Sequence, residues 1–367
     1  MPVKKVALSD LPEEILFDIF SRLPTKSIGK FRTLSNTWRN LLSTPHFIKS
    51  HLVFQNTLHK SLILISPSPP AIRCVETISG DTVSRELELD LQGLCCELLG
   101  SCDGLVLLKN KEAEVFLVNP ITMEQSKIPD APVTVVNNNN TVLYGLGYDS
   151  VVDDYKVVAV FYLMPDNEIL IDPDYIEPDY VDTLVYVYYV KTGVWKKIES
   201  SLLHFGLPVN FSGTLLNGAI HWLTSKSRDC AVIAALDLES EVYFEIPAPT
   251  VADVNNLFFG SLSVLGGCLC VIDPFSSNVK SDAWIMKDYG AAESWSKLTL
   301  SGSCFGDFCQ PLCFIGGREE ELVVLVQGPR LVVYNVKEGA FKDMVVDRVP
   351  GKFVGGGTFV ESLVSPA

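Results

Sequence analysis

The chain has 367 residues, 47% of them hydrophobic and 20% charged, a balance that excludes an intrinsically disordered protein. Its net charge of −15 is uneven: residues 1–60 contain nine Lys/Arg against four Asp/Glu, so the remainder carries −20 and is excluded as a nucleic-acid binder. No apolar run is long enough to cross a bilayer, and the start "MPVKKVALSD" reaches an acid too soon for a secretory signal, so we expect a cytoplasmic or nuclear protein.

Residues 11–23 predict an amphipathic helix, which Pro24 ends. Its apolar side chains form two stripes about 100° apart: Leu11, Ile15, Ile19 and Leu23 in one, Leu16 and Phe20 in the other. A second short helix begins at Thr25, and a third begins near Asn36 and stops at Pro45. Three helices in about forty residues bury too little surface to be stable alone. The apolar surface of the first helix must therefore meet either the rest of the chain or a separate protein.

The head of the chain also matches a known motif. The stretch "LSDLPEEILFDIFSRLPTKSIGKFRTLSNTWRNLLSTPHF" resembles the F-box in its Leu-Pro opening, its second Leu-Pro pair and its closing "SNTWR". In that family the motif docks on the Skp adaptor of a cullin-based ubiquitin ligase, so the resemblance implies this adaptor and, through it, cullin as partners. Carried over by position, the residues that would form or support the docking face are Leu11, Pro12, Ile15, Leu16, Ile19, Leu23, Pro24, Ile28, Phe31 and Trp38. Gly29 departs from the motif and should loosen the second helix by up to about 1 kcal/mol.

From about residue 60 onward the chain predicts repeated β-strands. Aligned turn-plus-strand pieces recur at intervals of about 50 residues after a longer first interval, a period typical of propeller blades. The pieces are "VNPITMEQSKIP", "YVKTGVWKKIE", "LDLESEVYFEIP", "YGAAESWSKLTL" and "YNVKEGAFKDMV". Each unit predicts about four strands, and we count about six units. The first unit contains three strands and the C-terminal "GTFVESLVS" supplies a spare one, so we expect a ring closed by the C-terminal strand; a pair of β-sandwiches is the alternative.

The expected fold is mainly β with a small α-helical N-terminal domain. We predict a three-helix domain over residues 1–50, a linker over 51–60 and a roughly six-bladed β-propeller over 61–367. The body also resembles the plant F-box-associated domain, a kelch-like interaction module, in pieces that include "GSCDGLVLL", "NPIT", "GLGYDSVVDDYKVVAV" and "FVESLV". This resemblance implies a module that recruits a substrate, without naming the substrate.

Three motifs could carry chemistry, and each also has a structural interpretation that the pattern favours. Cys102 in "GSCDG" has the spacing of a nucleophile elbow, but a strand follows where a helix is required, which favours a turn. Asp149, Asp153 and Asp154 suggest calcium, but the glycine and glutamate of the EF-hand pattern are missing, which favours a hairpin loop. His221 alternates as in a strand, which favours a core or inter-blade histidine. The ten cysteines form no C-x-x-C pair, and the sequence contains no H-E-x-x-H, P-loop or Ser/His/Asp signature, so we expect no catalytic residue, metal or cofactor.

The segment "MPDNEILIDPDYIEPDYVD", residues 164–182, is the most unusual part of the sequence. It contains seven acids, three prolines, two tyrosines and no basic residue, which predicts a long loop. One interpretation is a solvated excursion. The other is a substrate-binding loop that uses Asp172, Asp174, Tyr175 and Tyr180 to bind a basic partner.

Three functional hypotheses follow from these patterns. The first is a non-catalytic adaptor subunit of a ubiquitin ligase, whose helical head binds a Skp-type adaptor while the propeller presents a protein substrate. The second is an interaction protein that uses the same helical scaffold outside a ligase. The third is a propeller enzyme, which would need metal ligands or acids clustered at the central channel.

Overall fold

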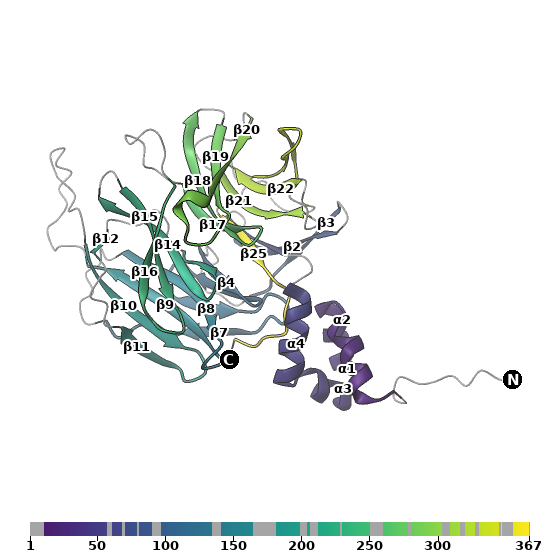
Figure 1. Cartoon of the computed structure of the whole chain (residues 1–367). Coiled ribbons are helices and arrows are strands. Elements are labelled where there is room, and N and C mark those ends of the chain that lie inside the picture. The colour runs from purple at the N-terminus through teal and green to yellow at the C-terminus, as the bar shows by residue number, and fades with distance from the viewer. Residues whose placement is uncertain are drawn as a thin grey trace.

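The computed structural model describes residues 11–56, 61–67, 70–78, 81–89, 97–133, 141–163, 181–198, 204–205, 212–227, 230–249, 260–277, 280–302, 309–315, 320–326, 330–344, 346 and 355–366. A small group of helices, which we call the helical head, lies against one side of a ring of β-sheets (Figure 1). The ring accounts for most of the chain, as the alternating strand patterns predicted.

The helical head contains α1 (Glu13–Ser21), α2 (Thr25–Leu34), α3 (Asn36–Leu42) and α4 (Pro45–Asn56). The prediction of three helices was one short, because Pro45 starts a helix instead of only stopping one. Proline is favourable at the first helical position, where its missing N–H costs no hydrogen bond, and Thr44 Oγ1 accepts from the Phe47 N–H at 3.3 Å to cap the first turn. Residues 51–56, which we predicted to be linker, are the second half of α4.

Six antiparallel sheets form the blades of the ring. Blade 1 contains β25 (Gly355–Phe359), β1 (Ser61–Pro67), β2 (Pro70–Ile78) and β3 (Asp81–Glu86), and blade 2 contains β4 (Glu97–Cys102), β5 (Leu105–Lys109), β6 (Val115–Val118) and β7 (Gln125–Ile128). Blade 3 contains β8 (Thr141–Asp149), β9 (Asp154–Tyr162), β10 (Val181–Tyr189) and β11 (Val194–Ile198), with β12 (His204–Phe205) paired to β10. Blade 4 contains β13 (Thr214–Leu216), β14 (Ala219–Ser227), β15 (Cys230–Asp237) and β16 (Tyr243–Pro247). Blade 5 contains β17 (Ser261–Leu265), β18 (Cys268–Ser277), β19 (Lys280–Met286) and β20 (Trp295–Ser301), and blade 6 contains β21 (Cys309–Phe314), β22 (Glu321–Val326), β23 (Arg330–Asn335) and β24 (Ala340–Asp343).

The ring is closed by the C-terminal strand. One strand of each blade is innermost in the ring. These innermost strands contact one another in the order β25, β4, β8, β13, β17, β21 and back to β25. β25 pairs antiparallel with β1, with Gly357 opposite Ile63, and Ser101 Oγ of β4 donates to the Thr358 carbonyl at 2.7 Å. The predicted propeller and its closure are confirmed, and the sandwich alternative is wrong. The five aligned sequence pieces are the outer hairpins β6–β7, β10–β11, β15–β16, β19–β20 and β23–β24.

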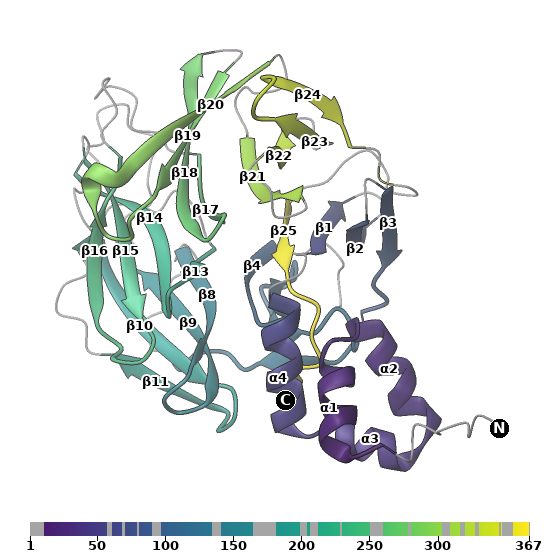
Figure 2. The same cartoon turned by 45° about the vertical axis from the view of Figure 1, so that its right-hand side comes forward.

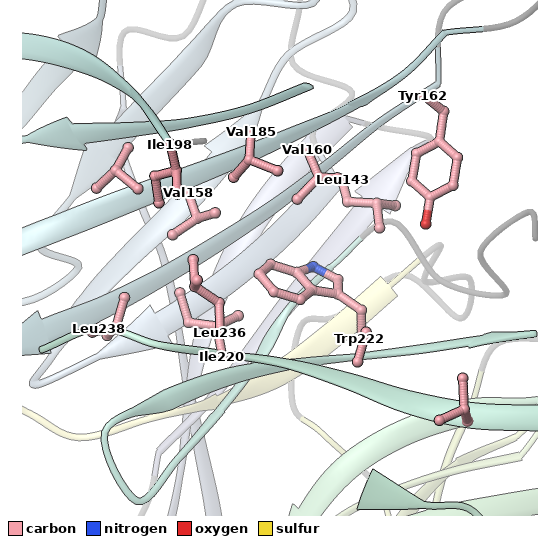
Figure 3. Packing of buried hydrophobic residues seen from close by; sticks show 13 residues of the cluster. Leu143, Val158, Val160, Tyr162, Val185, Ile198, Ile220, Trp222, Leu236 and Leu238 are labelled. Atoms are coloured by element: carbon pink, nitrogen blue, oxygen red, sulfur yellow. The ribbon is translucent and has the colours of Figure 1, made fainter. Parts of the chain in front are cut away.

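The core of the ring lies between neighbouring blades. Figure 3 shows the cluster between blades 3 and 4, where Trp222 of β14 lies among aliphatic side chains. The Trp222 indole donates to the Tyr144 carbonyl of β8 at 3.3 Å, so this side chain both fills and hydrogen-bonds the interface. Gly145 permits the close approach, because a Cβ there would lie 2.5 Å from Cγ2 of Ile220. Since blades of this kind bury little surface alone, these interfaces hold the ring together.

Candidate partner-docking surface

Helix α1 presents its two apolar stripes to different surroundings. Leu16 and Phe20 point into the helical head, where their residues are 6% and 0% exposed. Ile15 and Ile19, on the other stripe, are 47% and 41% exposed. Because two large aliphatic side chains on one helix face water while the core beneath them is complete, this face has the character of an interaction surface.

Aromatic side chains complete the core beneath α1. The Phe20 ring makes edge-to-face contacts with Phe31 and Trp38, with ring centroids 4.9 Å and 5.0 Å apart. Phe17 makes a similar contact with Phe47 of α4 at 5.4 Å. Such pairs contribute about 0.5–1.5 kcal/mol each beyond the burial of their surface. The core therefore fixes the rotation of α1 and so decides which stripe faces outward.

The ends of the helices are held by side chains from their neighbours. His51 Nε2 and Gln55 Nε2 of α4 both donate to the carbonyl of Leu23, at 2.8 Å and 3.1 Å, just after α1 ends. Burial lowers the pKa of His51, so the neutral ring is favoured. Arg32 of α2 donates twice to the carbonyl of Leu42 at the end of α3, at 2.7 Å and 3.2 Å. These bonds satisfy carbonyls that a helix leaves without an internal partner.

The ten residues predicted to form or support a docking face fall into three groups. Pro12, Ile15, Ile19 and Pro24 are exposed; Leu11, Leu23, Phe31 and Trp38 are half-buried; Leu16 and Ile28 are buried in the core of the helical head. The exposed four could contact a partner directly, whereas Leu16 and Ile28 could only hold the face in shape. We call the surface around Ile15 and Ile19 the docking face.

Sequence reasoning left out one exposed leucine. Leu34, at the end of α2, is 69% exposed although it follows Ile28 and Phe31 at helical spacing. The i, i+3 spacing puts Leu34 on the same side of α2 as the other two, and only the fold shows that it is exposed. No feature of the single sequence would have separated the exposed Leu34 from the buried Ile28 and the half-buried Phe31.

The candidate catalytic and metal residues have structural partners. "GSCDG" forms the β4–β5 hairpin, Cys102 is buried, and burial raises the pKa of its thiol, which disfavours a nucleophilic thiolate. Asp149 and Asp153 flank the β8–β9 hairpin and pair with lysines, as described below. His221 is buried and its Nε2 accepts from the Tyr289 hydroxyl of blade 5 at 2.7 Å, which makes it the inter-blade histidine that we predicted.

The described residues contain neither a cluster of metal ligands nor a helix that could span a membrane. No group of three or more His, Cys, Asp or Glu side chains in the described ranges is arranged to hold a metal ion. Among the described helices, α1 to α4 included, none has the length and apolar character needed to span a membrane. The predicted substrate-binding residues Asp172, Asp174, Tyr175 and Tyr180 lie outside the described residues.

Comparison with known proteins gives matches over nearly the whole chain. Residues 8–50 match the F-box domain, and residues 72–366 match the F-box associated beta propeller domain. The chain is similar to F-box protein CPR1 of Arabidopsis thaliana, with 30% identity over 94% of this chain and 87% of that protein. It is also similar to F-box/kelch-repeat protein At3g23880 of the same plant, with 27% identity over 97% of this chain and 96% of that protein.

Proposed function

The chain belongs to the F-box proteins that carry an F-box associated β-propeller domain, and from this premise we propose that it is a substrate-recognition subunit of a Skp–cullin–F-box ubiquitin ligase. In this proposal the docking face binds the Skp-type adaptor, which connects the chain to cullin, and the propeller binds a protein substrate. The chain performs no bond chemistry. Its contribution is to raise the effective concentration of substrate lysines near the charged ubiquitin carrier.

The observation that supports this proposal most directly is the exposure of Ile15 and Ile19. A helix whose core stripe is already filled by Leu16 and Phe20 gains nothing in stability from two further aliphatic side chains in water. Burying the exposed half of both side chains against a partner would contribute about 1–3 kcal/mol to association, since full burial of an aliphatic side chain is worth about 1.5–3 kcal/mol. The helices are held by the bonds to Leu23 and Leu42, so the docking face needs little ordering before it binds.

The test is the affinity of the full-length chain for a recombinant Skp-type adaptor, measured by titration calorimetry. Ile15→Asp and Ile19→Asp should each weaken binding by at least about 30-fold, because central interface residues typically cost 2 kcal/mol or more when their apolar contact is lost. Leu16→Asp is less informative, because Leu16 is buried and the change would disrupt the helical head itself.

The control is Val194→Asp. Val194 is an aliphatic residue of β11, comparably exposed, and lies on the propeller and not on α1. All three variants should retain the circular dichroism of the wild-type chain. If the adaptor binds the two isoleucine variants as tightly as it binds Val194→Asp, the assignment of the docking face is wrong.

The substrate can be sought by proximity labelling with the full-length Ile15→Asp variant. This variant should keep the propeller and its bound substrate while losing the connection to the ligase, so targets would accumulate instead of being degraded. Deleting residues 1–50 is less suitable, because it would cut α4 in the middle and expose Leu52, which packs against blade 2. Targets whose abundance is unchanged by proteasome inhibition would favour an interaction protein outside a ligase.

A further inference from the structure

Three sequence pieces that the docking function does not use meet at the junction between the helical head and the ring. They are "GSCDG" in the β4–β5 hairpin, "NPIT" in the β6–β7 hairpin, and "FVESLV" at the end of the chain. We call residues 360–364 the C-terminal strap. Figure 2 shows the chain leaving β25 and running beside the helices to its C-terminus.

The strap is bound to blade 2 by an asparagine of "NPIT". Asn119 is fully buried, and its Nδ2 donates to the carbonyls of Val364 at 2.7 Å and Ser362 at 3.2 Å. Its Oδ1 accepts from the backbone N–H of Ile121 at 2.8 Å, which holds its own turn. One amide side chain therefore orients both the β6–β7 hairpin and the strap, and a buried hydrogen-bonded asparagine is costly to replace.

The strap also lies directly on the β4–β5 hairpin. Gly104 has a φ of +87°, which favours glycine, and a Cβ there would lie 2.1 Å from the Ser362 hydroxyl oxygen and 2.6 Å from the Val360 carbonyl. Val360 and Val364 pack into the apolar cluster of blades 2 and 3. The absence of a side chain at Gly104 is therefore what lets the strap approach the ring.

The same strap reaches into the helical head. Leu363 is buried and belongs to the core formed by Leu16, Phe20 and Phe47. Thr25 Oγ1, at the start of α2, donates to the Glu361 carbonyl at 3.2 Å. Alternate residues of one short segment therefore serve two cores: the side chains of residues 360 and 364 pack on the ring, and the side chain of residue 363 packs in the head.

A second attachment comes from α4. Leu52 packs in the cluster of blades 2 and 3, and Lys49 Nζ pairs with Asp153 of the β8–β9 hairpin at 2.5 Å. Lys26 of α2 also pairs with Glu76 of β2, but both side chains are partly exposed, so this ion pair contributes little. Attachment at α4 alone would therefore leave the whole helical head able to turn about that one contact. Adding the strap on the α1 and α2 side gives contacts that do not lie on one line, and such contacts fix the orientation of one body relative to another.

We propose that the C-terminal strap is an inter-domain clamp that fixes the angle between the docking face and the propeller, with Leu363 and Asn119 as its positioning residues. The clamp would fix this angle whether or not the adaptor is bound. Its use rests on the proposed function: a ligase that acts by positioning needs the bound substrate held at a constant angle to the adaptor.

The test measures the angle in the full-length chain. Spectroscopic labels are placed as unnatural amino acids at Asn40 in α3 and Lys287 after β19, which are both exposed, and the distribution of distances between them is recorded. Leu363→Ala and Asn119→Ala should each broaden this distribution by about twofold or more, because domains joined by small interfaces move relative to each other.

The control is Leu42→Ala, which removes a buried leucine of the same head core that comes from α3 and not from the strap. A role of Leu363 in filling the core alone predicts the same distribution for Leu42→Ala and Leu363→Ala, and that result would overturn the clamp. Asn119→Ala lies in the ring and removes no side chain of the head core, so it still tests the clamp if Leu363→Ala fails to fold. An Asn119→Ala distribution as narrow as that of the wild type would also overturn it.

Adaptor affinity, measured on the same proteins, separates this inference from the proposed function. Asn119→Ala should bind the adaptor within about twofold of the wild type, because the docking face lies on α1 and not on the ring. A wild-type chain that binds no adaptor but still shows a narrow distribution would contradict the proposed function and leave the clamp standing.

Discussion

A buried lysine joins blades 3 and 4, and its removal is the most quantitative test of this structure. Lys156 of β9 has a side chain only 2% exposed, and its Nζ lies 2.8 Å from Asp149 Oδ2 and 3.0 Å from Glu241 Oε1. It also donates to the carbonyl of Leu238 at 2.6 Å. Lys156→Met keeps most of the length of the side chain and removes the charge and all three hydrogen bonds.

The expected cost follows from what the substitution leaves behind. Breaking a buried ion pair by removing one partner typically costs about 3–5 kcal/mol, because the other charge stays buried without compensation. Asp149 keeps hydrogen bonds from the backbone N–H groups of Val151 and Val152, at 2.8 Å and 3.3 Å, so we expect the lower end, about 3 kcal/mol. The assay is urea unfolding followed by tryptophan fluorescence, with the free energy of unfolding compared between variants.

Lys196→Met is the matched control, because Lys196 pairs with the same carboxylate, Glu241, at 2.6 Å, but its side chain is 59% exposed. An exposed pair contributes about 1 kcal/mol or less, since solvent screens the charges. The two variants should therefore differ by about 2 kcal/mol. Equal losses of stability for Lys156→Met and Lys196→Met would show that burial does not set the value of this network.

Two further predictions concern the helical head and its junction with the ring. Gly29 lies inside α2 with open space around it, so Gly29→Ala should stabilise the chain by up to about 1 kcal/mol, measured in the same urea titration; a loss of stability would contradict the open space. Burial, together with the neighbouring Glu76, raises the pKa of Glu361 to about 7 against the opposing effects of Lys26 and Arg85. The native state then holds a proton that the unfolded state releases, so stability falls as pH rises from about 4.5 to about 7, and Glu361→Gln should raise the melting temperature more at about pH 8 than at about pH 5. An equal effect of Glu361→Gln at both pH values would exclude this titration.

Local patterns in the sequence predicted much of the architecture. The alternation of apolar residues and the recurring turn pieces are properties of a few neighbouring residues, and they identified the outer hairpins such as β15–β16, whose pairing brings Ile233 opposite Ile246. The spare strand at the C-terminus was predictable because an unpaired edge must find a partner, and β1 offers one. The F-box was recognisable by resemblance, since its two Leu-Pro pairs and its closing "SNTWR" lie within one short stretch of sequence.

The tertiary structure alone decided which apolar side chains are available to a partner. Ile15 and Leu16 are adjacent, similarly apolar, and on stripes that the helix periodicity treats alike. Leu16 is buried because Leu363, from the far end of the chain, and Phe47 of α4 pack in the same core. Ile15 lies outside that core and is exposed. Lys156 likewise finds Glu241 85 residues away in the next blade. Contacts between residues this far apart depend on how the closed ring brings blades and termini together, and the spacing of residues along the sequence carries no record of that arrangement.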